Sequence, residues 1–214
     1  MQSTLPKTKM NSVNLIFPHQ LFQESPLFET NSTIYLVEEY LFFKQYKFHQ
    51  QKIAFHRATM KAYADYLINT KKLKVNYIES INKVSDIKEL LLLLKKEGVE
   101  HIGYVDPTDN WLQKRIERTC LRLGIKTMVY ESPLFLNTKE ELNDFFTKNK
   151  KKYFQTTFYT EQRKKRKILV DDLDKPYGGK WTFDAENRKK YPSKKIPPVV
   201  YLPEKDHYFE KAKL

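Results

Sequence analysis

The chain has 214 residues, of which 39 are Lys or Arg and 26 are Asp or Glu, giving a formal net charge of +13 at pH 7. This length supports one core of roughly 150 residues plus extensions, and the positive charge favours acidic partners without deciding the fold. The single cysteine, Cys120, excludes an internal disulfide and a metal site built only from cysteines. No apolar run approaches the ~20 residues of a membrane span, and residues 1–10 lack the apolar segment of a signal peptide. We therefore expect a cytoplasmic, monomeric protein that makes no membrane contact.

Residues 1–12 are polar and are expected to form a disordered leader. Five short apolar runs then have the form of buried strands, and they occupy residues 13–18, 33–38, 74–79, 101–106 and 126–131. Apolar residues at helical spacing on residues 53–67, 87–94 and 112–123 predict three helices that each bury one face. Asp86 marks a helix start, Gly98 and Gly124 mark stops, and Thr138 with Glu141 begins a fourth helix.

Strands that alternate with helices predict an α/β fold in residues 13–147, with an open, Rossmann-like parallel sheet covered by helices on both faces. The expected strand order is 3-2-1-4-5, which places a crevice beside the first strand at its carboxyl end. Polar side chains follow the strands at this edge. We expect Gln20, Glu38, Glu39 and Asp106 to contact a ligand there, whereas Glu79 and Glu131 are expected to cap helices.

The chain after residue 147 changes in composition. Residues 148–167 contain nine Lys or Arg and one acid, with aromatic residues between them. Such a run suits a phosphate backbone and stacked bases, and it equally suits the solvated face of an amphipathic helix. The two readings are compatible, and in the first the candidate DNA contacts are the last five residues, Arg163, Lys164, Lys165, Arg166 and Lys167.

A turn with large rings follows in residues 175–188, KPYGGKWTFDAENR, whose adjacent Gly178 and Gly179 permit a sharp bend. We expect Trp181 to fold back onto existing surface, because it is too apolar to remain in water. Residues 148–191 are therefore interpreted as a basic helical segment and a joint, and residues 192–214, which are rich in proline, as an extended linker.

Three stretches carry a resemblance to a known family: residues 175–188, residues 15–22 (LIFPHQLF) and residues 37–67. They resemble the deoxyribodipyrimidine photolyase-related family, which comprises iron–sulfur bacterial cryptochromes and prokaryotic (6-4) photolyases. The resemblance extends over nearly everything from Val13 to the C-terminus. Many members begin the first loop with Gly-Asp-Gln-Leu, whereas this chain has Pro18-His19-Gln20-Leu21.

The resemblance implies the N-terminal antenna domain, which holds 6,7-dimethyl-8-ribityllumazine and passes excitation to FAD in a following helical domain. FAD and a 4Fe-4S cluster are expected only in that domain, which this chain lacks, so the chain alone is expected to be inactive in DNA repair. The residues expected to hold the chromophore are His19, Gln20, Leu21, Glu38, Glu39, Tyr40, Lys52 and Asp106. The residues expected to face the helical domain are Trp181, Phe183, Asp184, Glu186, Asn187 and Arg188.

No catalytic residue and no metal site are predicted. The sequence has no G-x-G-x-x-G, no Walker lysine loop and no G-x-S-x-G, and light harvesting needs a fitted pocket instead of an acid, base or nucleophile. Two alternatives stay open. One is a stand-alone lumazine- or nucleotide-binding photosensory module, and the other is a basic nucleic-acid-binding α/β protein.

Overall fold

The computed structural model describes residues 11–147, 149, 151–202, 204 and 206–212, so the expected leader at residues 1–10 lies outside the described residues. The chain forms two compact units. The first unit comprises residues 1–134 together with 204–214, and the second unit comprises residues 135–203. No helix in the described ranges has the length and apolar character needed to cross a membrane.

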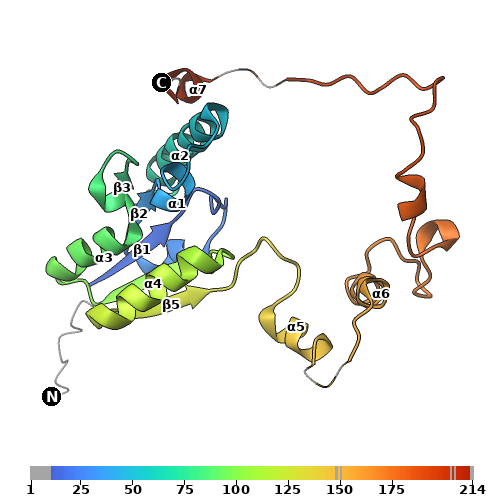
Figure 1. Ribbon diagram of the computed structural model, residues 1–214, viewed down its shortest axis with the longest axis horizontal. Helices are drawn as coiled ribbons and strands as arrows, with labels where there is room; N and C mark the ends of the chain where they lie inside the picture. Colours follow the sequence, from blue (N-terminus) through green and yellow to red (C-terminus); the bar gives the residue numbers. More distant parts are fainter. Residues whose placement is uncertain (1–10, 148, 150, 203, 205, 213–214) are drawn as a thin grey trace, which may run out of the picture. The chain divides into compact units, whose positions relative to one another are not determined.

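A five-stranded, all-parallel sheet forms the centre of the first unit (Figure 1). Its strands are β1 (Ser12–Ile16), β2 (Thr33–Val37), β3 (Val75–Ile78), β4 (His101–Val105) and β5 (Lys126–Tyr130). Their order is β3-β2-β1-β4-β5, so the expected 3-2-1-4-5 order is confirmed. The first strand begins at Ser12, within the range expected to be a leader, where Ser12 pairs with His101 of β4.

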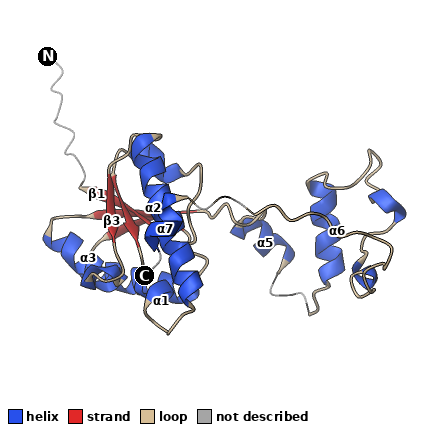
Figure 2. Ribbon diagram, turned by 90° about the horizontal axis from the view of Figure 1, so that it is seen from above, coloured by secondary structure: helices blue, strands red, loops and turns tan. Residues whose placement is uncertain are grey.

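Helices cover both faces of the sheet, as Figure 2 shows with α3 on one side and α2 on the other. On one face α2 (Gln50–Asn69) buries Met60, Ala64 and Leu67 against β1 and β2. On the other face α3 (Ile87–Lys96) and α4 (Asn110–Leu123) bury their leucine- and isoleucine-rich stripes against β1 and β4. The direction of winding therefore reverses between β1 and β4, and the carboxyl ends of these strands meet at the reversal.

The predicted helix boundaries are confirmed by their caps. The carboxylate of Asp86 accepts a hydrogen bond from the Lys88 amide at 2.8 Å, and Gly124 ends α4 with a left-handed φ of 62°. Thr138 and Glu141 form a reciprocal capping box at the start of α5 (Lys139–Phe145). One short helix was not expected: α1 (Tyr40–Phe43) follows β2 directly, and the side chain of Glu39 caps it.

Short 3-10 turns complete the first unit at Pro26–Thr30 and Lys83–Ser85. The range expected as a linker, 192–214, contains α7 (His207–Ala212), which belongs to the first unit and lies against α2. There the Tyr208 hydroxyl donates a hydrogen bond to Asp65 at 2.6 Å.

The second unit contains α5, α6 (Gln155–Lys165) and two 3-10 turns, Tyr177–Gly179 and Asp184–Glu186. The rings of Phe145 and Phe146 lie within 4.8–5.2 Å of the Phe158 ring, which joins α5 to α6. Glu141 adds ion pairs to Lys165 at 2.6 Å and to Arg166 at 2.7 Å. Basic residues of the run thus have partners inside this unit.

Candidate functional site

The carboxyl edge of the sheet carries an ion pair between the fully buried Glu38, directly after β2, and the partly buried Arg57 of α2. The guanidinium donates to both carboxylate oxygens at 3.0 and 2.9 Å, and the carboxylate also accepts from the Tyr77 hydroxyl and the Ser80 amide, each at 2.7 Å. Burial opposes ionisation, but these donors outweigh it and lower the pKa of Glu38. Four atoms already donate hydrogen bonds to the Glu38 carboxylate. A ligand group that binds this carboxylate would have to displace one of them.

The loop after β1 bridges to the end of β4 across the point where the winding reverses. The Gln20 side-chain amide donates to the backbone oxygens of Val105 at 2.9 Å and Asp106 at 3.2 Å. His19 Nε2 donates to the Pro107 oxygen at 2.7 Å, and the His19 ring stacks on Phe42 of α1 with centroids 4.9 Å apart. Because a carbonyl only accepts, the neutral His19 ring carries its proton on Nε2 and leaves Nδ1 as an acceptor.

Two buried acceptors in this bridge have no hydrogen-bond partner within the described chain: His19 Nδ1 and Gln20 Oε1. Burial lowers the pKa of His19, which favours the neutral ring and keeps Nδ1 an acceptor. Buried acceptors without donors are costly, by about 1–3 kcal/mol each. A ligand or a water molecule that brings hydrogen-bond donors to this edge would satisfy the two acceptors.

Glu39 is fully buried beside this bridge and joins α1 to α3. Its carboxylate accepts from the Leu41 amide at 2.6 Å and from the Ile87 amide at 3.4 Å, and it lies 4.0 Å from Arg115 Nε. Burial is the largest influence and raises the pKa of Glu39 to about 7, against the lowering effect of the two amides and of Arg115. A carboxyl that changes charge near neutral pH thus stands at the carboxyl edge.

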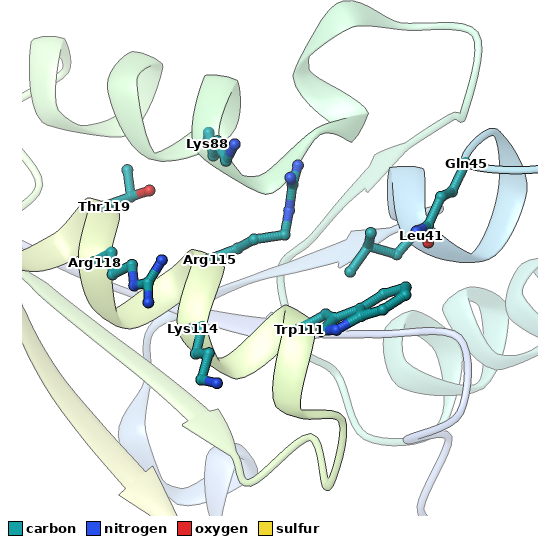
Figure 3. Close-up of a pocket in the computed structure, with 8 residues that line it drawn as sticks. All are labelled: Leu41, Gln45, Lys88, Trp111, Lys114, Arg115, Arg118 and Thr119. Carbon is teal, nitrogen blue, oxygen red and sulfur yellow. The ribbon is translucent and has the colours of Figure 1, made fainter.

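Arg115 of α4 connects three elements. It forms an ion pair with Asp86, the N-cap of α3, at 2.6 Å, and its guanidinium lies 5.8 Å from the centre of the Tyr40 ring in α1. Next to it opens a cavity of about 410 Å³, a size typical of small-molecule sites. Figure 3 shows the residues that line it: Leu41, Gln45, Lys88, Trp111, Lys114, Arg115, Arg118 and Thr119.

The cavity residues were missed in the sequence, although one signal for them exists. Trp111, Arg115 and Arg118 stand at positions i, i+4 and i+7 of α4 and share a helix face beside its apolar stripe. An aromatic residue and two arginines on one face indicate a binding surface as readily as a solvated one. The spacing does not reveal that residues of α1 and α3 lie opposite this face and form an open cavity with it.

The remaining residues expected to hold a chromophore lie around this edge at differing distances from the cavity. Tyr40 adjoins it through Arg115. Asp106 is buried, and its carboxylate accepts from the Thr108 amide at 2.8 Å. Leu21 packs into the α2-side core. Lys52 is exposed and lies over the Phe48 ring at 3.7 Å from its centre, and it does not line the cavity.

In the second unit, Arg163 differs from the other residues expected to bind DNA because it is buried. Its guanidinium donates to the backbone oxygens of Ile168, Leu169 and Trp181. Arg163 thus joins α6 to the turn that follows it, and only 6% of the residue is exposed. Lys164, Lys165 and Lys167 are exposed, and Arg166 is half-buried.

The expected fold-back of Trp181 is confirmed, since its ring lies 5.2 Å from the Arg163 guanidinium and 5.4 Å from Lys164 Nζ. Phe183 packs over Gly178, where a side chain would collide with the ring. The Asn187 amide lies 3.5 Å from Asp184, and Arg188 is exposed. The side chain of Glu186 lies outside the described residues. Around Trp181 and Phe183 the second unit has its own cavity of about 420 Å³.

Comparison with known proteins finds a family model and two relatives that match this chain. Residues 14–213 match the family model described as deoxyribodipyrimidine photo-lyase-related protein. An uncharacterized protein, R852, of Acanthamoeba polyphaga mimivirus is 34% identical over 195 residues, covering 86% of this chain and 97% of the viral protein. A (6-4) photolyase of Agrobacterium fabrum is 26% identical over 144 residues, covering 66% of this chain and 28% of the photolyase.

The raised pKa of Glu39 makes the free energy of unfolding depend on pH. Between pH 4.5 and about 7 the unfolded chain has released this proton while the folded chain still holds it. The contribution of Glu39 to stability therefore falls as the pH rises through this window, by about 1–3 kcal/mol. Glu39→Gln removes the ionisation, so the variant should gain stability relative to the unmodified protein between pH 5 and pH 8.

Urea unfolding at pH 5, 6, 7 and 8 measures this difference, with the exposed Glu97→Gln as the matched control. Parallel stability curves for the unmodified protein and Glu39→Gln across the whole range would show that Glu39 ionises at its ordinary pH.

Proposed function

The chain belongs to the deoxyribodipyrimidine photo-lyase-related family, and we propose that it binds a light-harvesting chromophore of the lumazine type at the carboxyl edge of its sheet. The observation that carries the proposal is the family match over residues 14–213 on a fold whose strand reversal lies at this edge. The chromophore in question is 6,7-dimethyl-8-ribityllumazine. Open parallel sheets bind their ligands at such a reversal.

The chemistry of the edge fits such a group. A lumazine ring presents an imide N–H and its ribityl chain presents hydroxyls, all of them donors. Two acceptors at the edge, His19 Nδ1 and Gln20 Oε1, are buried and have no partner among the described residues. The indole of Trp111 and the side chain of Leu41 offer apolar contact to a flat ring in the neighbouring cavity.

In this proposal the chromophore passes excitation energy to FAD in a separate helical domain, which also holds a 4Fe-4S cluster. The full system would use the light for DNA repair or for signalling in the cytoplasm. The aligned region spans 28% of the Agrobacterium photolyase, so repair itself is assigned to no residue of this chain. The platform for the helical domain would be the turn that carries Trp181 and Phe183, with Arg188 exposed at its end.

A second candidate is a stand-alone module that binds a lumazine or a nucleotide and acts as a photosensor. One observation favours it: the mimivirus protein is matched along 97% of its own length by this chain. The two candidates share the ligand and differ in what receives the excitation energy. Transfer to an added flavin-containing domain, measured as quenching of the chromophore's fluorescence, separates them.

DNA contact is proposed for the exposed cations of the second unit, Lys164, Lys165 and Lys167. Two of them pair with acids at the surface, Lys165 with Glu141 and Lys167 with Asp174. Exposed pairs of this kind are worth about 0–1 kcal/mol, so they yield readily to phosphate groups. Arg163 is left out of this surface because its guanidinium is buried.

We expect 6,7-dimethyl-8-ribityllumazine to bind the purified chain with a change in its fluorescence. Gln20→Ala should weaken binding by about 1–3 kcal/mol, because it removes a buried acceptor that the ligand would satisfy. Gln23→Ala is the matched control, since it changes the same residue type at an exposed position of the same loop. Thermal unfolding of each variant confirms that it folds. Absence of lumazine binding at saturating concentration would refute the chromophore proposal.

Salt dependence tests the DNA surface. Replacing Lys164, Lys165 and Lys167 together with Gln should lower the slope of log affinity against log salt by up to about 0.9 for each lost phosphate contact. Lys95, Lys96 and Arg122 are exposed in the first unit, and their replacement with Gln makes the same change in net charge. Equal slopes for the two triple variants would mean that the DNA affinity of the chain depends on its net charge and not on these three lysines.

A further inference from the structure

The described residues that line the cavity between α1, α3 and α4 include four cations and no acid. The cations are Lys88 of α3 and Lys114, Arg115 and Arg118 of α4. The remaining lining is Leu41, Gln45, Trp111 and Thr119, which carry no charge. Such a wall has a positive potential, which attracts an anionic group on a ligand.

Among the described residues, acids engage one of these cations. Arg115 pairs with Asp86 at 2.6 Å and lies 4.0 Å from a Glu39 oxygen. Lys88, Lys114 and Arg118 form no ion pair with any described residue, and all three are exposed. In Figure 3 Arg115 extends from α4 toward the side of α3 that carries Lys88. The acids near the cavity are thus held by Arg115, which leaves three cations for a ligand.

An apolar, flat surface lies at the other end of the cavity. Trp111 is 56% exposed although it stands in the first turn of a well-packed helix, and Figure 3 shows its indole close to Leu41 of α1. An indole exposed to this degree offers a face on which a planar ring can stack. The cavity volume of about 410 Å³ suits a ligand of mononucleotide size.

We propose that this cavity binds a phosphorylated planar ring of mononucleotide size. The ring lies against Trp111 and Leu41, and its phosphate is bound by Lys88 and Arg118. The proposal rests on the proposed function in one respect, namely that a planar ring binds at this edge. Since 6,7-dimethyl-8-ribityllumazine carries no phosphate, the inference adds that the cavity also accepts a phosphorylated ring and binds it more tightly than an unphosphorylated one. Arg118 suits this task because a guanidinium forms paired, charge-assisted hydrogen bonds to phosphate oxygens.

Riboflavin and flavin mononucleotide (FMN) provide a matched pair of probes, because they share one ring system and differ by one phosphate. Fluorescence titration of the full chain at low salt should give an FMN affinity about tenfold above that of riboflavin. Arg118→Gln and Lys88→Gln should each lose most of this preference while leaving riboflavin binding unchanged. Trp111→Ala should weaken both flavins equally.

Arg122→Gln is the matched control, because Arg122 is an exposed arginine of the same helix, one turn beyond Arg118, and does not line the cavity. It should keep the full preference for FMN. Since Lys88, Trp111 and Arg118 are exposed and lack ion-pair partners, their replacement should leave the unfolding midpoint unchanged.

Equal affinities for FMN and riboflavin would overturn the phosphate assignment, and lumazine binding would then uphold the chromophore proposal alone. A single-stranded oligonucleotide that displaces FMN, and binds more tightly than FMN in an Arg118-dependent way, would also overturn it in favour of nucleic acid. If no ring binds but pyrophosphate raises the unfolding midpoint of the unmodified chain and not of Arg118→Gln, the anion site stands and the chromophore function fails.

Discussion

The guanidinium of Arg115 holds together the edge of the sheet on which the candidate site depends. It pairs with Asp86 at the start of α3, lies against Glu39 at the start of α1 and covers the Tyr40 ring, all from α4. These elements are far apart in the sequence, and no strand pairing fixes α1 in place. Together with the Glu39 carboxylate, which accepts from the Leu41 and Ile87 amides, Arg115 links the walls of the cavity. Its positive charge also offsets that of the acids that would otherwise repel an anion.

Much of the fold follows from patterns that are local in the sequence. Short apolar runs, helical periodicity and the Asp86 and Gly124 boundaries suffice for the strand order, because parallel strands with right-handed crossovers leave few alternatives. The site follows only in part. Gln20, Glu39 and Asp106 do lie at the carboxyl edge, as strand ends must. The partners of Glu38 come from two segments distant in the sequence, α2 with Arg57 and the end of β3 with Tyr77 and Ser80, and no spacing reveals this.

The basic run at residues 163–167 also shows a feature that the sequence does not predict, namely which of its cations are buried. Five consecutive cations look alike in sequence, yet the chain after α6 turns back and surrounds Arg163 with backbone oxygens. Lys165 and Lys167 stay at the surface and pair with Glu141 and Asp174. The difference arises from the turn at Gly178 and Gly179 and from Trp181, whose ring closes over the guanidinium. A prediction from charge alone assigns DNA contact both to the buried Arg163 and to the exposed lysines beside it.

We propose that the ligand binds in the first unit, at the carboxyl edge between α1 and α4, and not at the second cavity beside Trp181 and Phe183. A crystal structure of the chain with bound 6,7-dimethyl-8-ribityllumazine or FMN tests this most directly. The account predicts a ring in contact with Leu41 or Trp111. A ring bound instead against Trp181 and Phe183 of the second unit, with the carboxyl edge unchanged, would contradict it.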